Sequence, residues 1–505
     1  MSHHRASKVS KSIIVIGAGL GGMAAAARLA KRGHKVKVFE AASFAGGKCR
    51  TEDISGFLFD TGPSLLTLPA VYRDLFVKTG KRLENLVQLS PVDPSFTYIF
   101  DDGKRVTFPN LSHSGTVLAI TESFGAQAGD AWHQLLTRAE KMWGASRQAF
   151  VESELRSPFQ MLKSPSLLRD LKTIAPFTSL RDLVRSYTDN VYIGKIIDRY
   201  ATYTGSDPRK VPAVLLTIAF VEEAFGAWHV SGGVGTLAKS LESRLSDLGV
   251  ELHLNTKVDR IITKSGVAIG IRLANGQVHN SDVVIANADA DLVYNQLLEK
   301  SSRTRSARNS LNKATASLSG FSLLIGLRGS SELGHHTVFF PKDYDAEFDS
   351  IVEKRRPVED PAIYICNPND PKMKRAGVDE SWSVLINAPR HQPKDGFNWD
   401  EKSSKEYSEH IVDLMEAKGL DIRSRIEVLE YRSPADLERD VNAPGGSIYG
   451  TSSNGARSAF WRARNRSKIK NLFLVGGSTH PGGGLPLVGI SAEIVAEAVE
   501  ENLEQ

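Results

Sequence analysis

The chain has 505 residues, which is too long for one hydrophobic core, so we expect at least two domains. Apolar residues make up 41% and charged residues 24%, a balance that is typical of globular proteins and excludes a disordered one. The net charge of +5 is too small to indicate a nucleic-acid partner, but it is compatible with weak attraction to an anionic membrane surface.

The two cysteines, Cys49 and Cys366, are too few for a disulfide framework, and we expect them to be buried free thiols in a reducing compartment. The apolar run from Ile13 to Ala27 follows a basic start, as in a signal peptide, but it is rich in glycine and lacks a clear cleavage site. Uncharged apolar stretches stay below the roughly 18 residues that span a bilayer. We therefore expect a cytoplasmic protein without a transmembrane helix or a metal site.

The first forty residues predict a βαβ unit. Ile13–Ile16 is a short apolar run rich in β-branched residues, as in a buried parallel strand. Met23–Lys31 is an alanine-rich helix and Lys35–Phe39 a second strand. The turn between the first strand and the helix reads Gly17-Ala18-Gly19-Leu20-Gly21-Gly22.

The glycines of this turn have separate physical roles in binding a dinucleotide. Gly17 permits the tight turn, Gly19 lets the backbone approach a pyrophosphate, and Gly22 lets the helix pack on the strand. The helix N-terminus adds free N–H donors. Glu40, at the end of the second strand, is placed to accept hydrogen bonds from an adenosine ribose. The alternative is a nucleotide-free α/β fold, as in relatives of this fold that bind prenylated proteins.

A second glycine-rich loop follows Glu40 and favours FAD over NAD. It contains Gly46, Gly47, Lys48 and Arg50, and its two cations could offset the charge of a pyrophosphate from the far side. A simple NAD dehydrogenase would instead continue directly into the next strand and helix. A solvated basic loop is the alternative interpretation of the two cations.

The C-terminal end shows a strand, a glycine loop and a helix in the same order. Leu472–Val475 is the expected strand, and Gly476 and Gly477 begin the loop. Gly489 and Ile490 then open a closing helix over residues 492–503. Such a helix N-terminus could stabilise negative charge on a reduced flavin. A nucleotide site built from both ends of the chain is unusual for an NAD enzyme, so the sequence predicts FAD.

Together these segments resemble the FAD-dependent carotenoid desaturases of the bacterial phytoene desaturase family, over nearly the whole chain. The resemblance implies an α/β fold with a Rossmann-like, GR2-type FAD-binding domain (1–85, 231–290 and 445–505). A discontinuous α+β substrate domain (86–230 and 291–444) would include a helical, partly apolar, membrane-associated segment. The most specific matching stretch is Thr479-His480-Pro481-Gly482-Gly483-Gly484-Leu485-Pro486, and the others are residues 15–22 with Glu40, 46–50, 60–64, 445–450 and 474–490.

The resemblance also implies cofactor contacts at Leu66, at the backbone of Val258 beside the adenine, and at Asn287 near the adenosine. Residues 199–203 look like the branch that desaturates 1-hydroxy- or methoxy-carotenoids at the 3,4 bond, as do residues 212–215 and 226–228. The 15-cis-phytoene branch is the main competitor. The family's membrane-surface location and its electron acceptor, quinone or oxygen, are further implications.

The remaining chain carries weaker signals. Ser90–Val106 should form antiparallel strands around a turn at residues 101–104, and residues 112–225 should be mainly helical. Arg457–Lys470 carries six basic residues interleaved with Phe460 and Trp461, and either contacts lipid or forms a solvated face. Apolar positions in the helical region line a long substrate, face a membrane or form an ordinary helix core: Leu167, Leu168, Leu171, Ile174, Phe177, Leu180 and Leu183.

No Ser-His-Asp or metal-ligand pattern stands out, so we name no catalytic residue. Desaturation needs a hydride acceptor, which flavin supplies, and a proton acceptor. Glu222, Glu223 and His229 are candidates for the latter, each with a structural role as the alternative. Two other functions stay open: an FAD oxidase of a small amine, and a lipid-binding protein without enzyme activity on the same fold.

Overall fold

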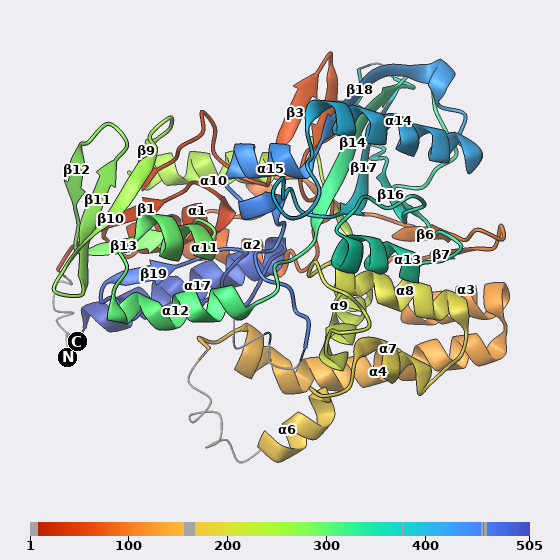
Figure 1. The fold of residues 1–505 in the computed structure, drawn as a ribbon, viewed down its shortest axis with the longest axis horizontal. Helices are drawn as coiled ribbons and strands as arrows, with labels where there is room; N and C mark the ends of the chain where they lie inside the picture. The colour runs from red at the N-terminus through yellow and green to blue at the C-terminus, as the bar shows by residue number, and fades with distance from the viewer. Residues whose placement is uncertain (1–8, 156–166, 376, 456–457, 459–461, 505) are drawn as a thin grey trace.

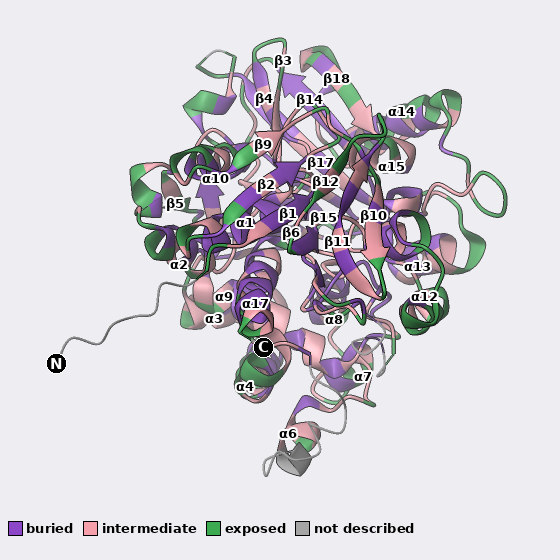
Figure 2. Cartoon of the chain, turned by 90° about the vertical axis from the view of Figure 1, so that its left-hand side faces the viewer, coloured by how far each residue is buried: buried purple, intermediate pink, exposed green. Residues whose placement is uncertain are grey.

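The computed structural model describes residues 9–155, 167–375, 377–455, 458 and 462–504. Figure 1 shows two lobes side by side, one around a parallel sheet that contains β1 and one around a larger mixed sheet that contains β14. Buried residues concentrate in the strands at the centre, and exposed residues on the outer helices (Figure 2).

The first lobe is built on a five-stranded parallel sheet in the order β19-β13-β1-β2-β9. Alternate residues of β1 serve two cores: Ile13 and Val15 pack toward α1, α10 and α17, while Ile14 and Ile16 pack toward β10 and β11. This two-sided burial explains why the strands are continuous apolar runs. The strands are Ser12–Ile16 (β1), Lys35–Phe39 (β2), Glu251–His253 (β9), Val283–Ala286 (β13) and Leu472–Leu474 (β19), and the covering elements are Leu20–Lys31 (α1), Gly235–Asp247 (α10), Leu485–Leu503 (α17), Val258–Lys264 (β10), Val267–Leu273 (β11) and Val278–Asn280 (β12).

The second lobe contains a seven-stranded sheet in the order β18-β14-β17-β16-β15-β6-β7. All its neighbouring strands are antiparallel except β15 and β6. Helix α14 packs on β14, β16 and β17, whereas α4, α8 and α9 pack near β6, β7 and β15. The strands are Phe96–Ile99 (β6), Arg105–Phe108 (β7), Ser319–Leu327 (β14), His336–Phe339 (β15), Ile363–Cys366 (β16), Glu380–Ala388 (β17) and Ile426–Arg432 (β18), and the helices are His113–Phe124 (α3), Ala126–Ser146 (α4), Leu167–Ile174 (α6), Leu180–Arg185 (α7), Val191–Thr202 (α8), Thr217–Phe225 (α9) and Glu401–Ala417 (α14).

The predicted βαβ unit, the hairpin at residues 101–104 and the helical region are confirmed, but two helices begin earlier than expected. Helix α1 begins at Leu20, three residues before Met23. Helix α17 begins at Leu485, because Gly484 with φ 101° ends the loop and Pro486 fits the first turn. The prediction that Gly489 opens this helix is therefore wrong. Gly489 lies inside it, where an added Cβ would approach Val71 Cγ1 of α2 (Ala70–Thr79) to 2.6 Å.

The apolar helical positions divide between core and surface. Ile174, Leu180 and Leu183 are buried, as in an ordinary helix core, whereas Phe177 is 91% exposed just after α6. The side chains of Leu167 and Leu168 lie outside the described residues. Among the helices that the structure describes, none is both long and apolar enough to cross a bilayer.

Both cysteines are free and buried, as expected. Asp60 is a buried carboxyl that joins the β3–β4 hairpin (Thr51–Ile54, Phe57–Asp60) to the turn before α10. Its Oδ1 accepts hydrogen bonds from Thr51 Oγ1 at 2.6 Å and from the Val234 N–H at 2.9 Å. Burial raises the pKa of Asp60 to about 7, and these two hydrogen bonds oppose the shift.

This pKa predicts how stability depends on pH. Because the folded pKa exceeds the unfolded value of about 3.9, the unfolded chain loses its proton first, so the free energy of unfolding falls from about pH 4 to pH 7. Asp60→Asn cannot ionise and keeps the Oδ1 acceptor. Relative to this variant, the wild type should lose on the order of 2 kcal/mol between pH 5 and pH 8 in denaturant unfolding. If the free energies of unfolding of the wild type and Asp60→Asn differ by the same amount at pH 5 and pH 8, the raised pKa of Asp60 is contradicted.

Candidate functional site

The glycine turn lies at the carboxyl end of β1, where it leads into α1. Gly17 has φ 92°, which favours glycine, and its N–H donates to the Phe39 carbonyl at 2.8 Å. Helix α1 has Gly19 as its N-cap, with no side-chain cap and no acidic residue in the first turn. Its first N–H groups are therefore left for an anion, as a pyrophosphate requires.

Close packing around the turn leaves no room for a side chain at Gly19 or at Gly22. An added Cβ at Gly19 would approach Asn287 Nδ2 to 2.6 Å, and one at Gly22 would collide with the Gly17 carbonyl oxygen. Asn287 follows β13, and its N–H donates to the Ile16 carbonyl at 2.7 Å. An added Cβ on Gly476 would lie 2.8 Å from Asn287 Oδ1. Asn287, expected near the adenosine, thus lies between the N-terminal turn and the C-terminal loop.

Glu40 is fixed against the same turn. Its Oε2 accepts from the Ala18 N–H at 2.7 Å and its Oε1 from the Ala42 N–H at 2.8 Å. Two backbone donors therefore hold the carboxylate at the end of β2, with lone pairs remaining on both oxygens. Its contact with a ribose stays a prediction.

Lys48 and Arg50 already have protein partners. Lys48 Nζ donates to the carbonyl oxygens of Ser447 at 3.1 Å and Ile448 at 2.6 Å. Burial lowers the pKa of Lys48, and the negative charge of Asp289 opposes that shift. Arg50 pairs with Glu52 and lies 4.2 Å from the centre of the Phe44 ring.

Neither cation belongs to a freely solvated loop, since both are only partly exposed. Lys48 instead connects the N-terminal glycine loop to residues 445–450, a segment distant in the sequence. The expected contact of Lys48 and Arg50 with a pyrophosphate stays a prediction.

Arg462 is a positioning residue that the sequence analysis missed. Its Nη1 donates to the carbonyls of Gly477 at 2.9 Å and Tyr449 at 3.1 Å, and its Nη2 donates to the Thr451 carbonyl at 2.7 Å. Burial lowers the pKa of Arg462 to about 10. A buried cation thus ties the C-terminal glycine loop to residues 449–451, which the solvated basic face proposed for this region would not do.

Other residues of the basic segment behave differently. Arg466 pairs with Glu154 and Glu501 on the surface, whereas Phe460 and Trp461 lie outside the described residues. The sequence does not predict that a basic residue of this segment binds backbone carbonyls. Residue 462 lies beside residue 477 only in the folded chain.

The remaining predicted cofactor contacts are buried side chains. Leu66 is fully buried, and its backbone pairs with Trp228 through hydrogen bonds of 3.2 Å and 2.9 Å. Val258 begins β10 in the core behind β1, and Ile490 lies in the second turn of α17. Their contacts with a flavin, and those of Gly477 and Gly489, stay predictions.

The proposed proton acceptors are engaged to different extents. Glu223 accepts from Trp132 Nε1 at 3.0 Å and contacts His113, which gives it a structural role between helices. Both oxygens of Glu222 accept, from Tyr200 at 2.8 Å and Tyr203 at 3.0 Å. His229 Nε2 and Asp370 Oδ2 lie 2.9 Å apart.

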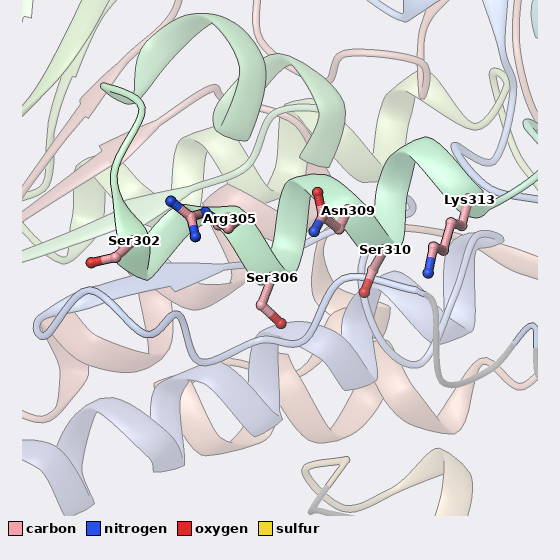
Figure 3. A pocket seen from close by; sticks show the side chains of 6 residues that line it. All are labelled: Ser302, Arg305, Ser306, Asn309, Ser310 and Lys313. Carbon is pink, nitrogen blue, oxygen red and sulfur yellow. The ribbon is translucent and has the colours of Figure 1, made fainter.

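Two hollows in the described part of the chain differ in position, since one adjoins these loops and the other does not. Figure 3 shows one of about 400 Å³ lined by side chains of a single helix, α12 (Ser302–Lys313), and it contains no predicted cofactor residue. The other, about 190 Å³, adjoins the cofactor loops and is lined in part by Asp289, Ser447 and Ser478. The candidate site therefore lies at the loops and not along α12.

The residues present fit FAD, because the uncapped helix, the glycines of the turn and the fixed carboxylate match its pyrophosphate and ribose. Residues 20–321 match the family described as flavin containing amine oxidoreductase. The chain belongs to this family and is an FAD-dependent oxidoreductase.

Relatives in the sequence comparison act on carotenoids. The chain is 33% identical to a zeta-carotene-forming phytoene desaturase of Myxococcus xanthus, covering 97% of the chain and 94% of the relative. It is 30% identical to a 4,4'-diapolycopene oxygenase of Methylomonas sp (99% and 100% covered) and to a 1-hydroxycarotenoid 3,4-desaturase of Flavobacterium sp. (97% and 99% covered). A solved oxidoreductase from Methanosarcina mazei shares the fold, with a TM-score of 0.64 at 18% identity over 96% of this chain and 100% of that one.

A glycine substitution tests the flavin cradle, which we define as the glycine turn at residues 17–22 together with Glu40. Gly22→Ala places a methyl group against the Gly17 carbonyl, so the turn must distort and the purified protein should retain less than a tenth of the wild-type flavin. Gly144→Ala, in α4, is the matched control because an added Cβ there meets nothing within 4 Å. Equal flavin absorbance in both variants would contradict the assignment of the turn.

Proposed function

We propose that this protein is a carotenoid desaturase that forms a carbon–carbon double bond in an acyclic polyene. The carrying observation is the flavin cradle, together with relatives named for carotenoid conversion that match along nearly the whole chain. FAD, when bound, supplies the chemistry by accepting a hydride from the substrate.

The chain's own residues position that cofactor and keep water away. The N–H groups at the start of α1 bind the pyrophosphate, while Asn287 fills the space between the two glycine loops. Lys48 and Arg462 hold the flanking segments through backbone carbonyls. The start of α1, Lys48, Asn287 and Arg462 are separated in the sequence. The site therefore forms only when the chain is folded.

The finer proposal is 3,4-desaturation of a 1-hydroxy- or methoxy-carotenoid. It rests on residues 199–203, in which the sequence resembles that branch, and on their place in a buried polar network. Arg199 Nη1 donates to Tyr203 Oη at 2.8 Å, and that hydroxyl donates to Glu222. Desaturation of 15-cis-phytoene is the alternative within the same reaction class.

A second candidate function is oxygenation of the carotenoid, because a 30% identical relative that covers 99% of this chain is a 4,4'-diapolycopene oxygenase. The two reactions leave different products. A desaturase product is two hydrogens lighter than the substrate, and an oxygenase product carries added oxygen.

Anaerobic turnover tests the proposal. Liposomes carrying a 1-hydroxycarotenoid should bleach the oxidised flavin spectrum, and mass spectrometry should find a product that has lost two hydrogens. The 1-hydroxycarotenoid should reduce the flavin at least tenfold faster than 15-cis-phytoene. Faster reduction by phytoene would overturn the branch, and a flavin that no carotenoid reduces would overturn the function.

We also propose peripheral binding to the membrane that dissolves such a substrate, with quinone or oxygen as the electron acceptor. Phe177 supports the location because it is 91% exposed beside α6, which projects from the lower edge of the molecule in Figure 1. Exposed aromatic side chains of this kind insert at lipid interfaces.

Cosedimentation with anionic liposomes tests this location. Phe177→Asp should reduce the bound fraction several-fold, because a carboxylate opposes insertion into the lipid. Val378→Asp adds the same charge at a 64% exposed position and is the control. Equal losses in both variants would indicate a general charge effect and contradict a contact at Phe177.

A further inference from the structure

Three histidines lie in a row, in which His229 and His336 are buried and His335 is half-buried. The ring centres of His229 and His335 lie 5.0 Å apart, and those of His335 and His336 lie 4.5 Å apart. His229 belongs to β8 (Trp228–Val230), whereas His336 begins β15. The row ends at Asp370, whose Oδ2 lies 2.9 Å from His229 Nε2.

The inner end of the row is oriented by two hydroxyl groups. His336 Nδ1 lies 2.8 Å from Tyr364 Oη, which lies 2.9 Å from Ser64 Oγ. When Nδ1 carries the proton, it donates to Tyr364 and the tyrosine donates to Ser64. The lone pair on His336 Nε2 is then free to accept a proton.

Two nitrogens of the row have no partner. The Nε2 atoms of His335 and His336 are buried and make no hydrogen bond to any residue that the structure describes. Leaving such an atom unpaired costs about 1–3 kcal/mol. His336 is 1% exposed, so its unpaired Nε2 lies inside the protein and not at the surface.

The inner end also adjoins the cofactor loops. Ser64 ends the turn at residues 60–64, in which an added Cβ on Gly62 would collide with the Lys48 carbonyl oxygen. The loop of Lys48 rests on the glycine turn, since an added Cβ on Gly47 would lie 3.3 Å from Gly19 Cα. Ser64 therefore connects the histidine row to the segment that packs on the FAD cradle.

Burial and the charges around the row favour the neutral form of its inner two rings. Burial lowers the pKa of His336 well below its usual value, and the nearby His335 and Arg199 lower it further. Tyr364 and, on the paired strand, Cys366 are its other titratable neighbours. Burial and His229 lower the pKa of His335 to about 3, and Asp370 opposes this. Both rings are thus neutral near pH 7, so each has a nitrogen lone pair that can accept a proton.

The outer end can receive that proton. Burial alone would raise the pKa of Asp370, but hydrogen bonds from His229 and from the N–H groups of Gly232 and Lys372 bring it below its usual value. The carboxylate is therefore charged, and its Oδ2 lies 2.9 Å from His229 Nε2. Asp370 itself is 6% exposed, but Pro371 and Lys372, which follow it, are exposed, so the row ends near the surface.

We propose that His336 Nε2 accepts the proton that the substrate loses, and that His335, His229 and Asp370 pass it to solvent. This inference rests on the proposed desaturation. One C–H bond breaks with both electrons, and the hydride reduces FAD. The second C–H bond leaves its electron pair in the new double bond while its proton goes to His336, so atoms and charges balance.

The experiment is anaerobic single-turnover reduction by carotenoid-loaded liposomes. His336→Phe keeps a flat ring between Phe96 and Tyr364, and His336→Gln keeps a polar side chain in case the first variant misfolds. Both should bind FAD with the wild-type spectrum, yet reduce it at least 100-fold more slowly. His410→Gln, on α14, is the control and should keep the wild-type rate.

Two further readouts separate proton transfer from packing. Free imidazole should restore flavin reduction in His336→Gly, because it supplies the missing base in the space left by the ring. A pH indicator should show one proton released per flavin reduced by the wild type, and a slower release in His229→Asn. Metal analysis of the wild type should find no stoichiometric ion.

The outcomes distinguish the inference from the function on which it rests. Rapid reduction of the wild type together with unchanged rates in both His336 variants would overturn the relay alone. Loss of bound flavin in both variants would also overturn it, since the ring would then be structural. One bound zinc ion per chain would assign His335, His336 and Cys366, whose ligand atoms lie within 4.8 Å of one another, to a metal instead. A wild type that no carotenoid reduces would overturn both proposals.

Discussion

The close approach of backbone to backbone at the end of β1 is the constraint on which the site depends. A pyrophosphate can reach the N–H groups of α1 only because Gly19 and Gly22 carry no side chains, and these glycines leave just enough space for Asn287. The same amide lies beside Gly476 at the other end of the chain. The Asn287 side chain therefore joins the glycine turn near the N-terminus to the glycine loop near the C-terminus, and the predicted cofactor site forms only when both segments are folded.

Two cations hold the outer parts of this assembly, the buried Arg462 and the half-buried Lys48. Lys48 and Arg462 each donate to carbonyl oxygens of a segment distant in sequence, and both have pKa values lowered by burial. Carbonyl acceptors carry only partial charge, so these contacts fix loops in place without neutralising the cations completely. Positive charge thereby remains close to the two glycine loops that are predicted to bind the cofactor.

The local pattern of the sequence was enough to predict the βαβ unit, because strand, glycine turn, helix and acid all lie within forty residues. It also predicted the hairpin at residues 101–104 and the C-terminal strand. Helix α17 begins earlier than the sequence pattern predicts. Gly484 and Pro486 are typical of a loop, but here they cap the helix and lie in its first turn. Local signals at a boundary of this kind favour either interpretation.

The contacts between distant segments could not be predicted from the chain alone. Nothing near Arg462 in the sequence indicates that its partners are the carbonyls of Tyr449, Thr451 and Gly477. The row of His229, His335 and His336 likewise joins positions more than a hundred residues apart in the sequence, through contacts between their rings. Sequence patterns predicted the cofactor, whereas only three-dimensional packing brings Arg462 and the three histidines to their partners.

The most direct test of this account is the cofactor content of the purified protein. Heat-released ligand, identified by mass spectrometry and quantified by visible absorbance, should be FAD at one molecule per chain, and added FAD should saturate any empty fraction. A colourless protein that takes up no FAD, with Gly17, Gly19, Gly22 and Glu40 intact, would contradict the account at its base.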